Sequence, residues 1–430
     1  MRAALATAET FPGATIATEK LRGVMLWLMG CAGAFVFVEP SPYEVVGVLT
    51  MTVFVVTGLS LSARLTPLVI LLVILNIGYA TALIAVADQD RPVTWVGVSA
   101  FLGLTAIFYA AMLGRNTQMR LTWLMRGYLA AAVIASTAGI AGYVHITEGL
   151  SDLFLRYGRA RGTFNDPNVL GAFLLLPGLL LVQRVLAGRS AQALWSGMLL
   201  TIVMGGLFLS FSRAAWGIFA PCAMILMALT FVTSRSAKER LRIVAIAIMG
   251  VVLLAVALAA LLSIGNVADL FKERATLDQS YDLGHLGRFG RYILGANLAL
   301  ENSLGLGPMQ FYKFFREDPH NTFLNSFMSG GWLAGCAYAT LTFVTMISGL
   351  RFLFVATPWR PVYQAIYVAY LGIVIESAVI DIDHWRHYFL ILGVLWGLMA
   401  ATRRYCDGRG AGDEDGNSSR ALAFPGHSAA

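Results

Sequence analysis

Long apolar runs separated by short polar ones dominate the chain. A helix needs about 20 apolar residues to cross a bilayer, and runs close to that length recur from one end of the chain to the other. The pattern therefore predicts an all-α, polytopic integral membrane protein with about twelve transmembrane helices. These are expected at residues 23–38, 43–61, 66–86, 93–113, 122–143, 167–183, 192–211, 214–232, 242–263, 322–350, 362–380 and 387–402.

The polar connections between these runs predict how the chain is oriented. Lys and Arg are concentrated in every second connection, and the positive-inside rule assigns those connections to the cytoplasm. Both termini are then cytoplasmic. The expected regions are an N-terminus at 1–22, nine helices at 23–263, a large periplasmic loop at 264–321, three helices at 322–402 and a disordered cytoplasmic tail at 403–430, whose end is rich in Gly, Ser and Asp.

Composition narrows the function. The chain is 58% hydrophobic and 13% charged, against about 25% charged residues in a soluble domain. Its net charge of +7 comes from short loops, where Lys and Arg act as topology signals, so we expect no nucleic-acid partner. The four cysteines lie in apolar runs or in the tail, which supports neither a disulfide framework nor a zinc site. We expect no cleavable signal peptide.

Two segments carry positive charge on the predicted outer side, against the rule. The first, residues 145–167, contains Arg161–Asn168 (RGTFNDPN), in which Asp166 can cap a helix that begins at Pro167. In between, Ser212–Arg213 splits an apolar stretch that is too long for one span. A helix cap and an arginine that extends to the membrane surface are the purely structural interpretations of these motifs.

The large loop is the second such segment. Arg288 and Arg291 lie three residues apart, on one face of an expected helix that ends near Glu301. A turn at Gly305–Pro308 follows, and His320–Asn321 leads into the tenth span, with Asn321 as its cap. Taken alone, a histidine beside a helix start is more often structural than catalytic.

The three motifs become more informative together. The sixth, eighth and tenth spans all begin at the outer face, so their N-termini present unpaired backbone N–H groups and the positive ends of helix dipoles there. Together with Arg161, Arg213 and Arg288, these N-termini predict a binding site for a phosphate or diphosphate. The paired aspartates at 88 and 90 and at 381 and 383 are interpreted as ordinary polar turns, and no metal site is predicted.

The same residues resemble motifs of the bacterial O-antigen ligases and the related O-antigen and exopolysaccharide polymerases. Arg161–Asn168 is similar to a segment that opens a span in that family, with Asp166 where Asn is usual. Ser212–Arg213 resembles its Ser-Arg turn, Arg288 with Tyr292 its arginine-plus-aromatic segment, and His320–Asn321 its His-Asn pair. A glutamate that often follows that pair is absent, since Ser329–Gly331 stands there. The resemblance covers residues 156–335.

The resemblance implies an inverting, metal-independent glycosyltransferase of the inner membrane, without a cofactor. It would move a glycan from a polyprenyl-diphosphate donor to a hydroxyl of a glycan or of lipid A core, at the periplasmic face. His320 would act as the base and Arg213 and Arg288 as the diphosphate clamp. Arg161, Asn168, Ser212, Arg291 and Asn321 are the expected substrate-binding residues.

The sequence leaves several alternatives open. It does not decide between a polymerase and a ligase, and it fixes neither the sugar and its linkage nor the oligomeric state. Twelve spans also suit a secondary transporter, although transporters place ionisable residues near the bilayer midplane, whereas here they gather at one face. A flippase for lipid-linked sugars would also need arginines for the diphosphate, but in a channel deep within the membrane.

Overall fold

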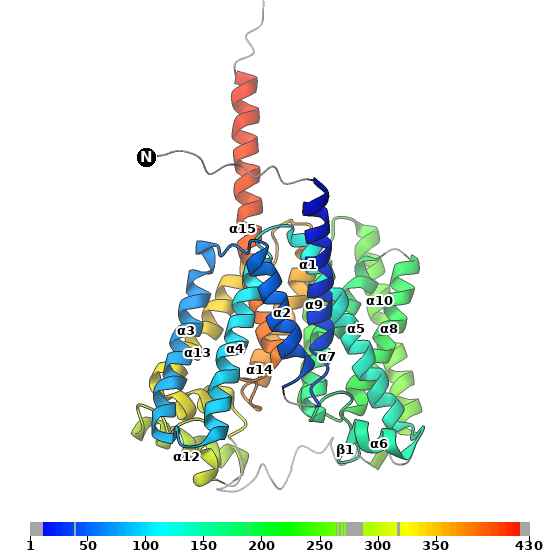
Figure 1. The fold of residues 1–430 in the computed structure, drawn as a ribbon. Coiled ribbons are helices and arrows are strands. Elements are labelled where there is room, and N and C mark those ends of the chain that lie inside the picture. The colour runs from blue at the N-terminus through cyan, green and yellow to red at the C-terminus, as the bar shows by residue number, and fades with distance from the viewer. Residues whose placement is uncertain are drawn as a thin grey trace, which may run out of the picture.

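A computed structural model describes residues 12–37, 40–188, 190–263, 265, 268–269, 271, 287–315 and 319–421. Within them the fold is a bundle of long helices that run in alternating directions (Figure 1). Most of the predicted loop 264–321 that precedes Gly287 lies outside the described residues. Residues 1–11 of the predicted N-terminus lie outside them as well. The first half comprises α1 (Pro12–Ala32), α2 (Pro42–Val56), η1 (Ala63–Leu65), α3 (Thr66–Leu83), η2 (Ile84–Val86), α4 (Asp90–Met112), α5 (Thr117–Tyr143), α6 (Glu148–Phe154), β1 (Leu155–Arg156) and β2 (Arg159–Ala160).

The second half continues the bundle and adds one short amphipathic helix, α12, at its periphery. It comprises α7 (Pro167–Ala187), α8 (Ser190–Leu209), α9 (Arg213–Thr233), α10 (Ala237–Leu262), α12 (Arg288–Glu301), η3 (Phe311–Lys313), α13 (Thr322–Leu350), α14 (Arg360–Glu376) and α15 (Arg386–Ala421).

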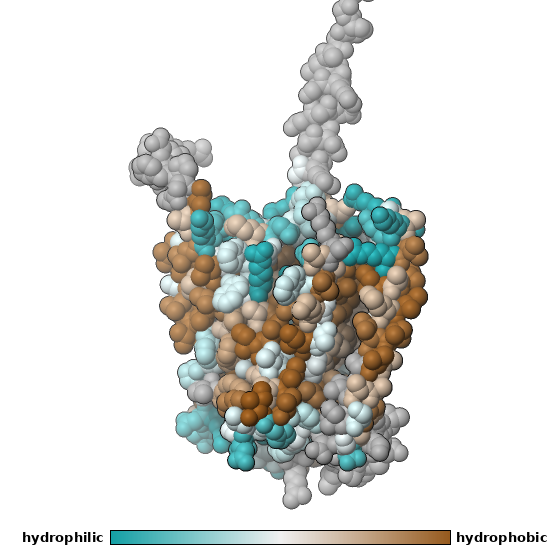
Figure 2. Space-filling model, turned by 90° about the vertical axis from the view of Figure 1, so that its right-hand side faces the viewer, coloured by the Kyte–Doolittle hydropathy of each residue, from teal (hydrophilic) through white to brown (hydrophobic). Residues whose placement is uncertain are grey.

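The protein is a multi-pass membrane protein. Among the described residues, nine helices are long and apolar enough to cross a membrane. Figure 2 shows a broad apolar band between two polar rims, as expected for a protein with lipid around its middle. The other three expected spans correspond to α1, α2 and α14, which are also helical. Because α2 has 15 residues and α14 has 17, the count of twelve stays a prediction.

We call the two ends of the bundle the site end and the tail end. The site end carries α6, the β1–β2 hairpin and α12, and α7, α9 and α13 begin there; α15 ends at the tail end (Figure 1). α15 continues to Ala421, past residue 403 where a disordered tail is expected. The first proline in this segment is Pro425, so no residue before it breaks the helix outright. α15 therefore overlaps the expected disordered tail at 403–430, which stays a prediction.

The centre of the bundle is formed by α7 and α15. In each, 78% of the residues in the most apolar window are buried, against 6% in α10, which lies at the edge of the bundle. Small residues allow the central helices to approach closely: a Cβ at Gly393 in α15 would lie 2.3 Å from the Ala106 carbonyl oxygen in α4. Such small-residue contacts are typical of helix packing in membranes. Because α7 and α15 are tightly packed, their first residues are held in place at the site end.

Candidate functional site

Three helices begin at the site end, each with the cap that its sequence predicts. The Asp166 carboxylate accepts a hydrogen bond from the Asn168 backbone N–H at the start of α7, and Pro167 occupies the first turn. Ser212 caps α9 and Asn321 caps α13 by accepting from Ala215 and Leu324. Each cap satisfies one of the four unpaired N–H groups of a helix start. The positive ends of three helix dipoles are therefore directed to the same end of the bundle.

Arg159, rather than the expected Arg161, joins two of these helix starts. The Arg159 side chain is buried, with its Nε donating to the Ser210 carbonyl oxygen at 2.8 Å and its Nη2 to the Asn168 Oδ1 at 2.7 Å. Arg161 instead donates to the carbonyl oxygens of Leu153 at 3.1 Å and of Asp152 at 3.5 Å. The structure thus brings Asn168 and the Ser210–Ser212 turn together and places Arg161 at the end of α6.

The β1–β2 hairpin explains why Arg159 takes the place predicted for Arg161. β1 pairs antiparallel with β2, with Arg156 opposite Arg159, and only Arg159 of these two is directed into the bundle. Side chains on a strand alternate between two faces, but two-residue strands leave too short a pattern to predict which face is buried. Sequence reasoning therefore selected the arginine nearest the Gly-Thr turn and missed the one that packs inside.

Ser212 and Arg213 occupy the predicted turn between α8 and α9. Ser212 is buried as the cap, and Arg213 is the first residue of α9 and half-buried. A charged side chain that is half-buried at the start of a membrane helix must be hydrated or face a polar partner. Arg213 thus lies at the N-terminus of a helix that packs on both α7 and α14.

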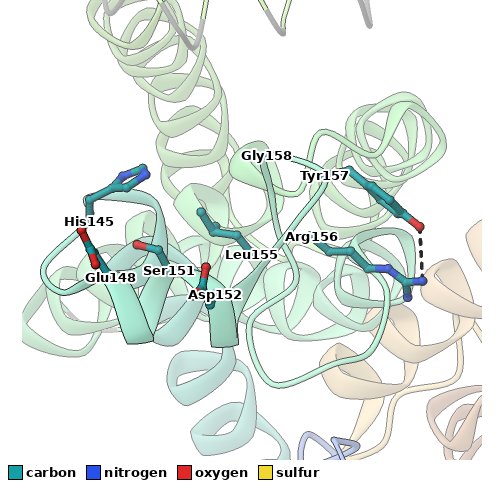
Figure 3. Close-up of a pocket in the computed structure, with 8 residues that line it drawn as sticks. All are labelled: His145, Glu148, Ser151, Asp152, Leu155, Arg156, Tyr157 and Gly158. Atoms are coloured by element: carbon teal, nitrogen blue, oxygen red, sulfur yellow. Dashed lines mark hydrogen bonds between the residues drawn. The ribbon is translucent and has the colours of Figure 1, made fainter.

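The pocket beside the hairpin contains none of the predicted site residues. Figure 3 shows it between the α5–α6 segment, with His145, Glu148 and Asp152, and the hairpin, with Arg156 and Tyr157. It has a volume of about 520 Å³. Arg156 donates to the Tyr157 hydroxyl at 3.4 Å, as the dashed line in Figure 3 marks, and to the Asn165 carbonyl oxygen at 2.7 Å. This pocket is a polar surface hollow next to the helix starts.

The amphipathic helix expected after Gly287 is present as α12, and it docks onto the start of α13. The Tyr292 hydroxyl lies 3.0 Å from the His320 carbonyl oxygen and 3.1 Å from that of Ala378. Arg291 is buried. Arg288 is the first residue of α12, one turn before Tyr292.

The predicted turn at Gly305–Pro308 packs on a break in α13. Gly331 has a φ of +69° inside that helix, and the Trp332 N–H donates to the Ser303 carbonyl oxygen at 2.9 Å. A Cβ at Gly331 would lie 2.5 Å from that same oxygen. Glycine is therefore required at position 331, and the segment Ser329–Gly331, where the resemblance would place a glutamate, packs against this turn.

His320 faces a carboxylate that sequence reasoning set aside as part of an ordinary polar turn. Its Nδ1 lies 3.9 Å from Asp381 Oδ2, in the loop between α14 and α15. The φ of His320 is +51°, a conformation that is rare outside glycine and is often found at functional sites. The pairing of a histidine with an aspartate 61 residues away leaves no local pattern, so only the fold reveals it.

The same loop is held to α13 by further polar contacts. The Asn325 side chain donates to Asp383 Oδ2 at 2.8 Å, and the Ser329 hydroxyl donates to Asn325 Oδ1 at 3.0 Å. His384 Nδ1 lies 3.3 Å from Asp383 Oδ1. These contacts fix the loop that carries Asp381 against the helix that begins beside His320. Within the described part of the chain, no three His, Cys, Asp or Glu side chains are grouped to hold a metal ion.

α14 contacts both halves of the site. α14 packs on α7 and α9, which carry Asn168 and Arg213. Its last turn also binds α13: the Thr322 N–H donates to the Ser377 carbonyl oxygen at 2.8 Å, and the Asn321 side chain to that of Ala378 at 3.1 Å. The helix starts with their arginines and the His320–Asp381 pair therefore share α14 as a common neighbour.

Comparison with known proteins adds no family. No protein-family model matches the chain, and no curated protein matches it either. The resemblance to O-antigen ligases and polymerases therefore rests on the short motifs alone.

Proposed function

We propose that the protein is an inverting, metal-independent glycosyltransferase of the O-antigen ligase and polymerase type. Its donor is a glycan linked to polyprenyl diphosphate in the bacterial inner membrane, and its acceptor is a hydroxyl of a glycan or of lipid A core. The site end faces the periplasm, and no cofactor takes part.

An anion site and a base lie at the same end of the bundle, and this arrangement supports the proposal. Three capped helix N-termini and arginines of α9, α12 and the hairpin offer an anion site. A histidine with a carboxylate behind it, His320 with Asp381, offers a base. A lipid-diphosphate donor and a hydroxyl acceptor require these two functions side by side.

The proposed reaction is a single displacement at the anomeric carbon. Asp381 faces Nδ1 of His320, which leaves Nε2 to take the proton of the acceptor hydroxyl. The acceptor oxygen bonds to the anomeric carbon as the bond from that carbon to the diphosphate oxygen breaks. The diphosphate leaves as an anion, and Arg213 and Arg288 stabilise the charge that develops on it.

Replacing Arg213 or Arg288 by Lys tests the clamp. Lys retains the charge but loses the two parallel hydrogen bonds of a guanidinium, so we expect turnover to fall about tenfold to a hundredfold. The measurement is product formation from labelled lipid-linked donor by the purified chain. Wild-type turnover in both Lys variants would remove the clamp from the mechanism.

The transporter and the flippase are separated from this proposal by a second measurement on the same proteoliposomes. The carboxyl group of Glu376 is buried at the last residue of α14, near a helix end and not at mid-helix, which supports chemistry at a surface. Donor conversion without net flux of sugar or lipid supports the transferase; flux or flipping without conversion contradicts it. Offering a glycan acceptor and a lipid A core acceptor separately then decides between polymerase and ligase.

Orientation has its own test. Alkaline-phosphatase fusions are active only in the periplasm, so we expect activity for a fusion at Asp278 and none for a fusion at Ser418. The opposite result would place the site end in the cytoplasm and exclude a periplasmic reaction.

A further inference from the structure

A cavity lies at the tail end of the bundle, far from the proposed reaction. It has a volume of about 260 Å³ and is enclosed by the starts of α5, α8 and α14 and by the end of α7. Gln118, Thr122, Gln183, Arg184 and Gln192 contribute its polar groups, and no carboxylate of the described residues lines it. Hydrogen-bond donors therefore predominate over acidic groups in this cavity.

Two arginines at this cavity share no carboxylate. Arg184 lines it, and Arg126 follows the lining residue Met125 on α5, close enough for the two positive charges to act on each other. Neither guanidinium has a hydrogen bond or an ion pair among the described residues. Elsewhere at this end, Arg22 and Arg120 both bind Glu19. Arg126 is exposed and Arg184 is half-buried, so the two neighbouring positive charges are available to an anion from outside the chain.

Ordinary helix stabilisation does not account for the pair. Cations favour helix C-termini, but the last turn of α7 is already served, since the Gly188 N–H donates to the Arg184 carbonyl oxygen at 2.8 Å and Arg242 to that of Val185 at 3.2 Å. Arg126 is nine residues into α5, roughly 14 Å along the helix at 1.5 Å per residue. Arg126 is therefore beyond the first turn of α5, where the helix dipole acts on a charge.

We propose that this cavity binds the phosphate of an anionic phospholipid headgroup. The lipid is favoured over a soluble anion because α8 leads from Gln192 in the cavity wall to an exposed apolar surface: Leu194 is 69% exposed, Trp195 66% and Met198 52%. That surface can take acyl chains, and an exposed tryptophan is typical of the membrane interface. The cavity is also smaller than the roughly 300–1,000 Å³ of a pocket for a whole organic ligand, which suits a headgroup whose chains remain outside.

Native mass spectrometry of the purified full chain tests this binding. We expect the wild-type chain to retain phosphatidylglycerol in preference to phosphatidylcholine. Arg126→Gln with Arg184→Gln should weaken phosphatidylglycerol binding about 30-fold, because each basic group near a membrane surface contributes about 1 kcal/mol. Arg115→Gln with Lys238→Gln removes two exposed charges from the same end, outside the cavity, and should leave binding unchanged.

The outcomes separate the possible ligands. Equal retention of phosphatidylglycerol by the wild type and the double Gln variant would overturn the proposal. So would displacement of the lipid by millimolar inorganic phosphate, with the same dependence on both arginines, because the cavity would then be a soluble-anion site. If the Gln pair lowers the yield of folded protein, Arg126→Lys with Arg184→Lys is used instead, because it retains both charges. Its retention of phosphatidylglycerol should lie between the wild-type retention of phosphatidylglycerol and the wild-type retention of phosphatidylcholine. The test is independent of glycosyl transfer, so it stands even where no transferase activity is found.

Discussion

Arginines at the two ends of the bundle are held in different ways. At the tail end, Arg22 and Arg120 bind Glu19, and Arg64 binds Asp407 at 2.7 Å, so carboxylates neutralise them. At the site end, Arg156 and Arg161 donate to backbone carbonyl oxygens. A carbonyl oxygen orients a guanidinium without cancelling its charge. The number of arginines at an end therefore does not reveal an anion site. The hydrogen-bond partner of each arginine shows whether its positive charge remains available to a ligand.

Neither pattern holds throughout its end, since Arg242, Arg360 and Arg404 at the tail end also donate to backbone carbonyl oxygens. At the site end, Arg386 forms an ion pair with Glu44 at 2.7 Å, which ties the start of α15 to α2. At the tail end, Arg126 and Arg184 lack a carboxylate partner within the described residues. Arg386 therefore belongs with the structural arginines, and the tail-end pair with the anion-binding ones. The partner predicts the role better than the end of the bundle does.

The largest effect is expected at His320, where the site end would carry out chemistry. His320→Ala and His320→Gln should each lower turnover about 10²–10⁴-fold, because the acceptor hydroxyl loses its base. The measurement is single-turnover transfer with labelled donor. Insertion into the membrane and donor binding should be unchanged.

A second histidine at the same end provides the control. His145 is exposed, and its Nδ1 lies 2.7 Å from the Tyr143 carbonyl oxygen. His145→Gln should leave turnover within a few-fold of the wild type. If His320→Gln did the same, His320 would be a structural residue that joins the loop to α13.

The tail end should respond in stability instead. Burial by itself raises the pKa of the Glu19 carboxyl, but hydrogen bonds with Arg120 and Arg22 outweigh burial and lower that pKa from 4.5 to about 2. Its contribution to stability is therefore full above pH 4.5 and is lost as the pH falls toward 2. Glu19→Gln leaves two buried arginines without their carboxylate and should lower the free energy of unfolding by about 3 kcal/mol, with turnover per folded molecule unchanged.

Thermal unfolding in detergent measures this effect, with the exposed Arg64–Asp407 pair as reference. Asp407→Asn should cost about 1 kcal/mol or less, as for other surface ion pairs. A Glu19→Gln variant as stable as Asp407→Asn would show that the tail-end carboxylate does not hold α1 to α5.

A smaller effect should distinguish two arginines that are two residues apart. Arg159→Lys breaks the two-pronged link between Ser210 and Asn168 and should lower turnover about tenfold by shifting the helix starts. Arg161→Lys should change turnover by only a few-fold, because Arg161 binds the end of α6. Equal losses at both positions would favour the sequence-based assignment of Arg161 to the anion site.

These comparisons show what the sequence could predict. The caps Asp166, Ser212 and Asn321 and the helix that starts at Arg288 follow from local patterns, and the structure has them at the expected residues. The apolar runs predict helices, but the helix ends differ from the expected ones, as α1 at Pro12–Ala32 shows. The hairpin at 155–160 was missed because two-residue strands are too short to show an alternation. Contacts between residues far apart in the sequence leave no local trace, so the carboxylate facing His320 was missed as well.

A loss similar to that at Arg159 is expected at Asp381, which would act through His320 without touching substrate. Asp381→Asn should lower kcat about tenfold with little change in KM for the donor, because the amide holds the imidazole less firmly than a carboxylate 3.9 Å from Nδ1. A purely structural role would instead change stability and KM together. The decisive measurement is the double variant: in a His320→Gln background, Asp381→Asn should cause no further loss, since two residues that act as a unit are not additive. Asp383→Asn in the same loop is the control for loop packing, because Asp383 binds Asn325 and not His320. Independent, multiplicative losses from His320→Gln and Asp381→Asn would separate the two residues and confine Asp381 to holding the loop.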